Sequence, residues 1–263
     1  MYTKRKIRAK SIMLIATLAA VYIILRIIPT FPLVGVPGAR FSASDFVVSI
    51  YGVILGPYAS SLCVIIGTFI GYFAGRPPIF YGLDFMPATV NGLIVGLIVQ
   101  GRRKHALLIF LILLVLFVIH PFAQILIPVK GVFGQSNFAF PFAWMHLLGL
   151  ITLASPLGSR MASLISKSSV MQLAVGFSLA SFVGTLSQHL MGNLLYASTI
   201  LPLLSEQARA TNWMIIFWLY PIERITIVVL STVISVPLIR ALRSSGSLLK
   251  VEGGQTQTEG WRR

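Results

Sequence analysis

An uncharged stretch of 30 residues, from Phe46 to Gly75, most constrains how this chain can fold. One helix needs about 20 apolar residues to cross a bilayer, so the stretch is too long for one comfortable crossing and short for two. Gly56 and Pro57 interrupt it, and glycine and other small residues recur along it. How often this stretch crosses therefore decides on which side of the membrane every later loop lies.

The composition is typical of a membrane protein. Of the 263 residues, 56% are hydrophobic and only 10% are charged, with a mean hydropathy of +0.88, whereas a soluble domain carries roughly 25% charged residues. The predicted fold class is therefore an all-α polytopic membrane protein, a helix bundle. Besides residues 46–75, the expected spans are residues 11–28, 87–99, 106–127, 142–157, 170–198 and 213–237.

The net charge of +15 comes from 21 lysines and arginines against 6 acidic residues. Most of these basic residues lie in short loops and tails, which the excess of positive charge in cytoplasmic loops explains better than binding of nucleic acid. If residues 46–75 cross twice, there are about eight spans, and the two sides carry 15 and 4 basic residues; a single crossing gives 8 and 11. Only the double crossing gives an excess of basic residues on one side of the membrane, and it places both termini on that side, the cytoplasm.

A double crossing leaves the first arm, residues 45–55, only about 16 Å long at 1.5 Å per residue. It cannot cross a core of about 30 Å unaided. The preceding segment, PTFPLVGVPGARFSAS, contains three prolines and cannot form one helix. We expect it to dip into the membrane from outside, covered by protein or lining a water-filled cavity. The alternative is a short tilted hairpin in a locally thinned bilayer.

Large polar side chains within the spans gather toward the outer leaflet. Such groups are expensive in lipid and tend to mark substrate paths, so their position predicts an outward-facing pocket. Two stripes at helical spacing are Thr185, His189, Asn193 and Tyr196, and Trp213, Phe217, Tyr220 and Arg224. The alternative is that the aromatic residues lie at the membrane interface and that His189 and Asn193 form hydrogen bonds between helices. The residues predicted to bind a small polar molecule are Asn91, His189, Asn193, Tyr196, Tyr220 and Arg224.

Enzyme motifs are absent from the sequence, which contains no H-E-x-x-H, no G-x-S-x-G and no Walker A pattern. We therefore predict no catalytic residue, no cofactor and no metal ligand. A membrane-embedded enzyme or assembly factor would require His120, His146 and His189 to converge on a metal, which no ligand spacing supports. The neighbours Glu223 and Arg224 point about 100° apart on a helix, so we do not expect them to pair.

Several segments resemble the substrate-binding S components of energy-coupling factor (ECF) transporters, a family that takes up vitamins and related micronutrients. The basic N-terminus and the Pro/Gly-rich loop match, as does FSASDFVVSIYGVILGPYASSLCVIIGTFIGYFAG, which is similar to the family's short helix, Leu-Gly-Pro and glycine-spaced third helix. DFMPATVNGLIVGLIVQGRRK is similar to the fourth helix. The last two spans, with His189, Asn193 and PIERITIVVLSTVISVPLIRAL, are similar to the substrate-lining fifth and sixth helices.

The resemblance implies a subunit of the cell membrane that captures a small vitamin-like molecule from outside. It also implies a transmembrane T component and two ABC ATPases as partners for ATP-driven uptake, with Ala16 and Ala20 of the first span packing against the T component. The family has six spans, so residues 106–157 resemble an inserted helix pair. The alternative function is a stand-alone secondary transporter for a small organic solute, which the apolar inner halves of the spans disfavour. We expect one domain over residues 1–243 and a disordered cytoplasmic tail over residues 244–263.

Overall fold

The chain is predominantly helical. A computed structural model describes residues 2–129 and 138–245, so that most of the tail predicted to be disordered lies outside the described residues. The helices of the described part are α1 (Tyr2–Ile27), α2 (Val48–Phe73), α3 (Phe85–Val99), α4 (Arg103–Ile119), α5 (Trp144–Ala154), α6 (Pro156–Ser166), α7 (Val170–Thr199) and α8 (Glu206–Ser244). Short 3₁₀ turns, η1 (Ala43–Phe46) and η2 (Leu201–Leu203), precede α2 and α8.

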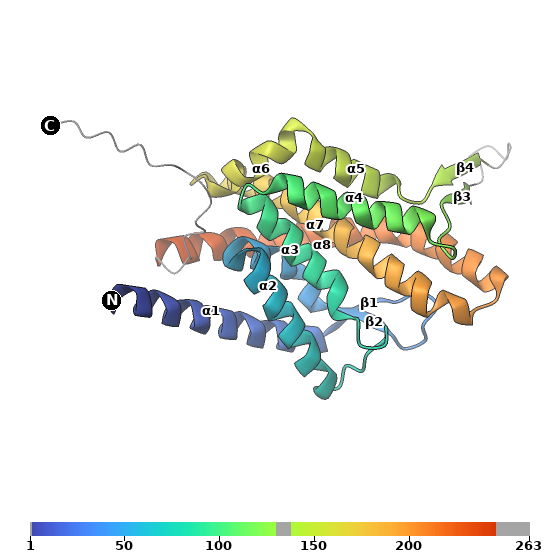
Figure 1. Cartoon of the computed structure of the whole chain (residues 1–263), viewed down its shortest axis with the longest axis horizontal. Coiled ribbons are helices and arrows are strands. Elements are labelled where there is room, and N and C mark those ends of the chain that lie inside the picture. The colour runs from blue at the N-terminus through green and yellow to red at the C-terminus, as the bar shows by residue number, and fades with distance from the viewer. Residues whose placement is uncertain (1, 130–137, 246–263) are drawn as a thin grey trace.

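Two small antiparallel hairpins connect the helices. The first pairs β1 (Pro29–Pro32) with β2 (Arg40–Ser42) between α1 and α2, and the second pairs β3 (Leu126–Val129) with β4 (Phe138–Pro141) between α4 and α5. The start of α1 and the end of α8 lie at the same end of the molecule, and both hairpins lie toward the other end (Figure 1). The bundle thus has one end that carries the helix termini and one that carries the hairpins.

The outer surface of the helices is apolar. Three helices, α2, α7 and α8, are long and apolar enough to cross a membrane, and the bent pair α5 and α6 would make a fourth crossing if it is one span. Large hydrophobic side chains face outward on these helices, with 94% of Phe73 and 63% of Ile222 exposed. Side chains of this kind are stable on an outer surface that lipid covers. The chain is therefore a helical membrane protein.

The predicted break in residues 46–75 is present at Gly56. Its backbone is non-helical, with φ 74° and ψ −179°, and Pro57 follows it. Glycine adopts a positive φ without the steric penalty of a side chain, and proline cannot donate to the preceding turn, so the two residues together stop the helix and restart it. Helix α2 therefore consists of a short first arm and a longer second arm.

The contacts of α2 with α3 show that the two arms are antiparallel. Successive residues of the first arm contact successively later residues of α3. Successive residues of the second arm contact successively earlier ones. The neighbours are Ser49 and Asn91, then Gly56 and Gln100, on the first arm, and Ser60 and Gly92, then Phe69 and Phe85, on the second. Helix α2 is thus a hairpin whose turn lies near the end of α3.

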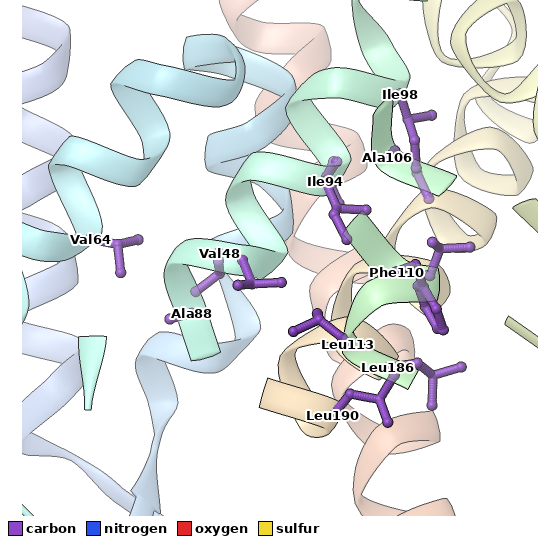
Figure 2. Close-up of a cluster of buried hydrophobic side chains, with 14 of the residues drawn as sticks. Val48, Val64, Ala88, Ile94, Ile98, Ala106, Phe110, Leu113, Leu186 and Leu190 are labelled. Carbon is purple, nitrogen blue, oxygen red and sulfur yellow. The ribbon is translucent and has the colours of Figure 1, made fainter. Parts of the chain in front are cut away.

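Glycines let this hairpin approach α3 closely. A Cβ added to Gly52 would lie 2.7 Å from the carbonyl oxygen of Gly92, and one added to Gly96 would overlap the backbone of Pro57. Such contacts are typical of membrane helices that pack through small residues. The core continues from α2 and α3 into α4 and α7 (Figure 2), through Val48, Val64, Ala88, Ile94, Ile98, Ala106, Phe110, Leu113, Leu186 and Leu190.

The expected span over residues 106–127 is wrong at its C-terminal end. Helix α4 stops at Ile119, and the chain then turns and enters β3. His120 has extended backbone angles, φ −70° and ψ 129°, because the ring of a following proline disfavours the helical conformation. Pro121 therefore ends the helix.

The expected span over residues 142–157 is also corrected. Helix α5 has only 11 residues, and α6 leaves it at an angle of 71°. Ser155 lies at the break in an extended conformation, and its side chain accepts a hydrogen bond of 3.2 Å from the backbone N–H of Leu157. A serine cap followed by Pro156 starts a new helix rather than extending the old one. The segment from Arg103 to Ser166 is thus one straight helix, α4, and one bent pair, α5 and α6.

The packing at the α2 turn makes a first prediction. Gly96→Ala should destabilise the fold by about 1–3 kcal/mol through overpacking against Pro57, which corresponds to a fall in melting temperature of roughly 2–4 °C per kcal/mol. Gly192→Ala is the matched control, since a Cβ there meets nothing within 4 Å, and alanine favours a helix over glycine by about 1 kcal/mol. Thermal unfolding in detergent should show opposite signs for the two variants; equal shifts would contradict the packing described.

Candidate functional site

A cavity of about 120 Å³ lies between α7, α8, the end of α1, the start of α3, and the segment that contains β1 and β2. An engineered protein cavity of about 150 Å³ binds benzene, so this cavity is of the size that holds a small ring. Its lining combines apolar and aromatic side chains with a few polar and charged ones. This combination is the usual composition of a small-molecule site.

The first hairpin forms a roof over the cavity, and we call residues 29–42 the roof segment. On one side, the Arg76 guanidinium donates a hydrogen bond of 2.6 Å to the carbonyl oxygen of Arg40. On the other side, Gly35 lies against the side chains of Tyr196 and Asn212, which are themselves joined by a hydrogen bond of 2.9 Å. The roof segment is therefore attached to the α2–α3 loop and to the ends of α7 and α8.

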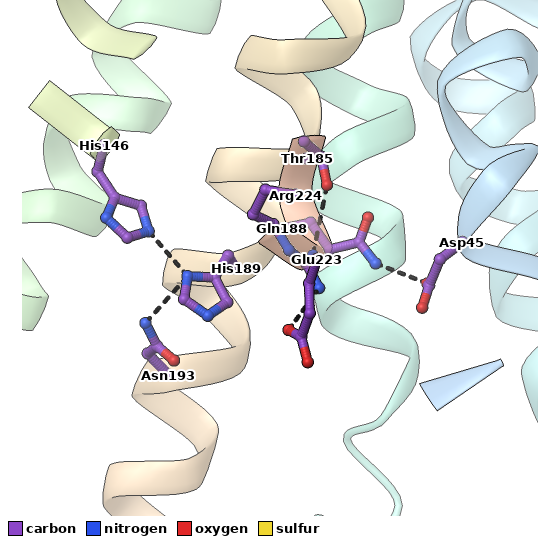
Figure 3. Close-up of polar contacts among 8 residues, drawn as sticks. All are labelled: Asp45, His146, Thr185, Gln188, His189, Asn193, Glu223 and Arg224. Atoms are coloured by element: carbon purple, nitrogen blue, oxygen red, sulfur yellow. Dashed lines mark hydrogen bonds and ion pairs between the residues drawn. The ribbon is translucent and has the colours of Figure 1, made fainter. Parts of the chain in front are cut away.

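A buried chain of hydrogen bonds forms one wall of the cavity and extends behind it. The Gln188 amide donates a hydrogen bond of 2.7 Å to Asp45 and accepts one of 2.7 Å from the Asn91 amide. The Asn91 amide oxygen accepts a hydrogen bond of 3.0 Å from the Ser49 hydroxyl, which in turn accepts one of 3.1 Å from the Ser181 hydroxyl. Figure 3 shows Gln188 pointing toward Asp45. The chain joins η1, α2, α3 and α7 and fixes the orientation of the Gln188 amide.

Arg224 is held beside the cavity by three groups. Its Nη1 donates 3.3 Å to the Thr185 hydroxyl, and its Nη2 lies 3.5 Å from a carboxylate oxygen of Glu223. Its guanidinium carbon is 5.7 Å from the centre of the Phe41 ring in the roof segment. The expectation that Glu223 and Arg224 do not pair is wrong, because both long side chains turn back into the same buried space.

Two histidines and a tyrosine stack beside Asn193. The His146 and His189 rings are 5.1 Å apart and nearly parallel, at 6°, and the Tyr220 ring lies 4.8 Å from His189 at 19°. The Tyr220 hydroxyl donates 2.9 Å to the carbonyl oxygen of Phe142. The stack therefore connects α7 and α8, which line the cavity, to α5, which lies behind them.

The Nδ1 atom of His189 has two polar neighbours. It lies 3.0 Å from His146 Nε2 and 3.4 Å from the Asn193 amide nitrogen (Figure 3). The other ring nitrogen, Nε2, has no hydrogen-bond partner within residues 2–129 and 138–245. His189, which lines the cavity, therefore keeps one ring nitrogen unengaged.

Most of the predicted ligand residues line the cavity. They are His189, Asn193, Tyr196, Tyr220 and Arg224. Asn91 is fully buried outside the lining, with its amide bonded to Ser49 and Gln188. Its position gives it the role of orienting Gln188 and does not support the predicted contact with a ligand.

The other predicted positions lie as follows. Trp213 is 1% exposed and donates 2.9 Å to the carbonyl oxygen of Phe122, so it is neither an interfacial aromatic nor part of the lining. Ala16 and Ala20 are exposed on the outer face of α1. His120 lies 3.0 Å from the Ser198 hydroxyl and does not join His146 and His189. Among the described residues, no group of three His, Cys, Asp or Glu side chains is placed to hold a metal ion.

Sequence reasoning missed several charged lining residues, which are Arg26, Arg40, Asp45, Arg76, Asp84 and Glu223. Partial burial lowers the pKa of Arg76, and the nearby positive charge of Arg26 lowers it further. The sequence could have indicated Arg40 and Arg76, since they belong to the few basic residues that the charge count assigns to the outer side of the membrane. The excess of positive charge in cytoplasmic loops does not explain basic residues on that side, so a functional role is the better interpretation of them.

Comparisons with protein-family models, with curated proteins and with solved structures found no match. The fold and the cavity define a helical membrane protein with a roofed cavity that is lined by apolar, aromatic and charged side chains. A function for this cavity has to be inferred from its own residues.

The hydrogen-bonded chain behind the cavity makes a second prediction. Asn91→Leu should lower the free energy of unfolding by about 1–3 kcal/mol, because it leaves buried polar groups of Ser49 and Gln188 unpaired. Thr89→Val on the same helix is the control, since the buried Thr89 hydroxyl has no partner in the described structure. Thermal unfolding should separate the two variants. A melting temperature of Asn91→Leu equal to that of Thr89→Val would show that the chain contributes little.

Proposed function

We propose that this chain is the membrane-embedded substrate-binding subunit of an ECF-type transporter, which captures a small vitamin-like molecule from outside for ATP-driven uptake. The observation that carries the proposal is the roofed cavity, which collects five predicted ligand residues from α7 and α8 beneath a loop that precedes a short helical arm. This arrangement agrees with the resemblance to the family of S components. It also provides a site that a loop movement alone could open.

The proposed topology places the chain in the cell membrane with about eight crossings and both termini in the cytoplasm. The common position of the start of α1 and the end of α8 supports it (Figure 1). So does the α2 turn, which lies close to Gln100 and to the basic residues that follow, where Arg102 donates 3.2 Å to the Tyr58 hydroxyl. Basic residues favour the cytoplasmic side, which puts the cavity in the opposite half of the membrane.

The proposed partners are a transmembrane T component and two ABC ATPases. The sequence contains no nucleotide-binding motif, so energy for uptake has to come from other subunits. Ala16 and Ala20, exposed on α1, present small residues at a spacing of four, which allows close approach of another membrane helix. They are the proposed contact with the T component.

A stand-alone secondary transporter is the second candidate. The hydroxyls of Ser231 and Ser235 favour it, since both are fully buried on α8 and have no partner among the described residues. Buried polar groups in a membrane helix are costly and often line an ion path. Uptake driven by an ion gradient in liposomes that contain this chain alone would favour this candidate over the first.

A direct test of the proposed function is to purify the chain from cells and identify bound small molecules by native mass spectrometry. We expect one tightly held compound in the wild type and at least a tenfold lower occupancy in Asn193→Leu, which removes a polar lining group. Met191→Leu is the control, because it conserves volume on the same helix outside the lining. Retention of the compound by Asn193→Leu, or no compound in any preparation, would count against the proposal.

The attachment of the roof segment makes a further prediction. Gly35→Ala should accelerate release of the co-purified compound by about tenfold, because a Cβ would collide with Asn212 and lift the roof segment. Gly38→Ala is the matched control: it carries the same backbone strain, with φ +76° against φ +74°, but a Cβ there meets nothing within 4 Å. The dissociation rate after dilution measures both. Equal rates would mean that the roof contact at Gly35 does not retain the compound.

A further inference from the structure

The carboxylates that line the cavity already have partners. Asp45 accepts 2.7 Å from Gln188, and Glu223 contacts Arg224. Asp84 accepts hydrogen bonds from the backbone N–H groups of Ile79 and Phe80, at 3.0 and 3.1 Å, so that it organises its own loop. Each lining carboxylate is therefore engaged by at least one group of the protein.

Two lining arginines, in contrast, have no anionic partner. Within the described residues, no carboxylate oxygen lies within 4.0 Å of Arg26 or Arg76, since the contact of Arg224 with Glu223 is the only ion pair at that distance. The buried Nε of Arg26 has no hydrogen-bond partner there, and Arg76 donates to a single carbonyl, that of Arg40. Burial and then the positive charge of Arg26 lower the pKa of Arg76, while the negative charges of Asp45 and Asp84, beyond 4.0 Å, offset only part of this effect.

Such a pair of guanidinium groups is unfavourable without a counter-charge. Removing charge from water costs several kcal/mol per ion unless an opposite charge compensates for it. A carboxylate fits the planar fork of a guanidinium through two parallel hydrogen bonds, which makes arginine well suited to recognising it. An anion bound between Arg26 and Arg76 would remove the repulsion between the two positive charges.

The remaining lining fits a flat molecule. Aromatic rings of Phe41, Phe80 and Tyr220 lie around the cavity, and the His189 ring has one nitrogen, Nε2, without a hydrogen-bond partner among the described residues. The space suits a single small ring.

From these groups we infer that the cavity binds a small planar organic anion, with a ring-borne carboxylate held between Arg26 and Arg76. This inference deepens the proposed function and rests on it for the cavity being a binding site. The carboxylate lies toward the α2–α3 loop in this arrangement, where both arginines line the cavity. The ring then extends toward α7 and α8.

The test uses the purified chain in nanodiscs of phosphatidylcholine, which carries no net charge. Monocyclic aromatic carboxylates are titrated beside their own primary amides, with benzoate and benzamide as the first pair, and affinity is measured by calorimetry. We expect at least one carboxylate to bind tenfold or more tightly than its amide. Arg26→Gln and Arg76→Gln should each weaken carboxylate binding at least tenfold and leave amide binding unchanged.

Controls separate a local effect of the arginines from loss of the fold. Arg160→Gln removes a positive charge on the exposed face of α6, far along the chain from the cavity lining, and should not change binding. Arg26→Lys keeps the charge but not the fork, so it should restore part of the affinity lost in Arg26→Gln. Melting temperatures show whether each variant is folded.

The inference is overturned if every amide binds as tightly as its carboxylate, if the two arginine variants bind carboxylates normally, or if inorganic phosphate binds more tightly than any carboxylate. A neutral or cationic compound found by native mass spectrometry would also overturn it while leaving the proposed function intact. Conversely, arginine-dependent carboxylate binding by a chain that never co-purifies from cells with a T component and ATPases would support the anion site and contradict the proposed transporter subunit.

Discussion

Pairing of buried polar groups is the constraint on which this structure depends. In lipid no water can replace a missing hydrogen-bond partner, so a buried polar side chain is costly unless the protein supplies one. The chain from Asp45 through Gln188, Asn91 and Ser49 supplies such partners across η1, α7, α3 and α2. It holds α7 against the α2 hairpin at the level of the cavity. The cavity wall and the packing behind it are therefore joined by one continuous set of bonds.

The histidine stack extends the same principle to α5. His146 does not line the cavity, yet it lies 3.0 Å from His189, which does, and its ring stacks on the ring of His189. Helix α5 thus helps to orient a lining residue, although α4, α5 and α6 lie outside the lining. The hydrogen bond at one ring nitrogen of a histidine determines what the other nitrogen can do.

The sequence predicted the features that depend on local rules. A Gly-Pro step inside an apolar run predicted the break in α2. The stripe on α7 lies on the face that meets the cavity except for Thr185, whereas only Tyr220 and Arg224 of the stripe on α8 belong to the lining. The expected ends of two spans were wrong because apolar residues continue past Pro121 and Pro156, and hydropathy does not register the turn that each proline imposes.

The role of Asn91 and the pairing of Glu223 with Arg224 could not be predicted from spacing alone. Asn91 is polar and lies in the outer half of its span, as a ligand residue would, and only tertiary contacts show that its amide is already occupied. Likewise, neighbouring residues on an ideal helix diverge, but long side chains in a confined space converge. Rotamer and packing choices of this kind are set by the whole bundle and not by the local sequence.

The roof segment has a consequence for timing. Its two strands have only four and three residues, and it is attached to the rest of the protein by few side-chain contacts. Opening it would break a handful of hydrogen bonds and leave the helices and their shared core in place. Entry into the cavity can then occur on the nanosecond-to-microsecond scale of loop motion, independently of slower collective movements of the bundle. A molecule could be captured and held long before any larger rearrangement begins.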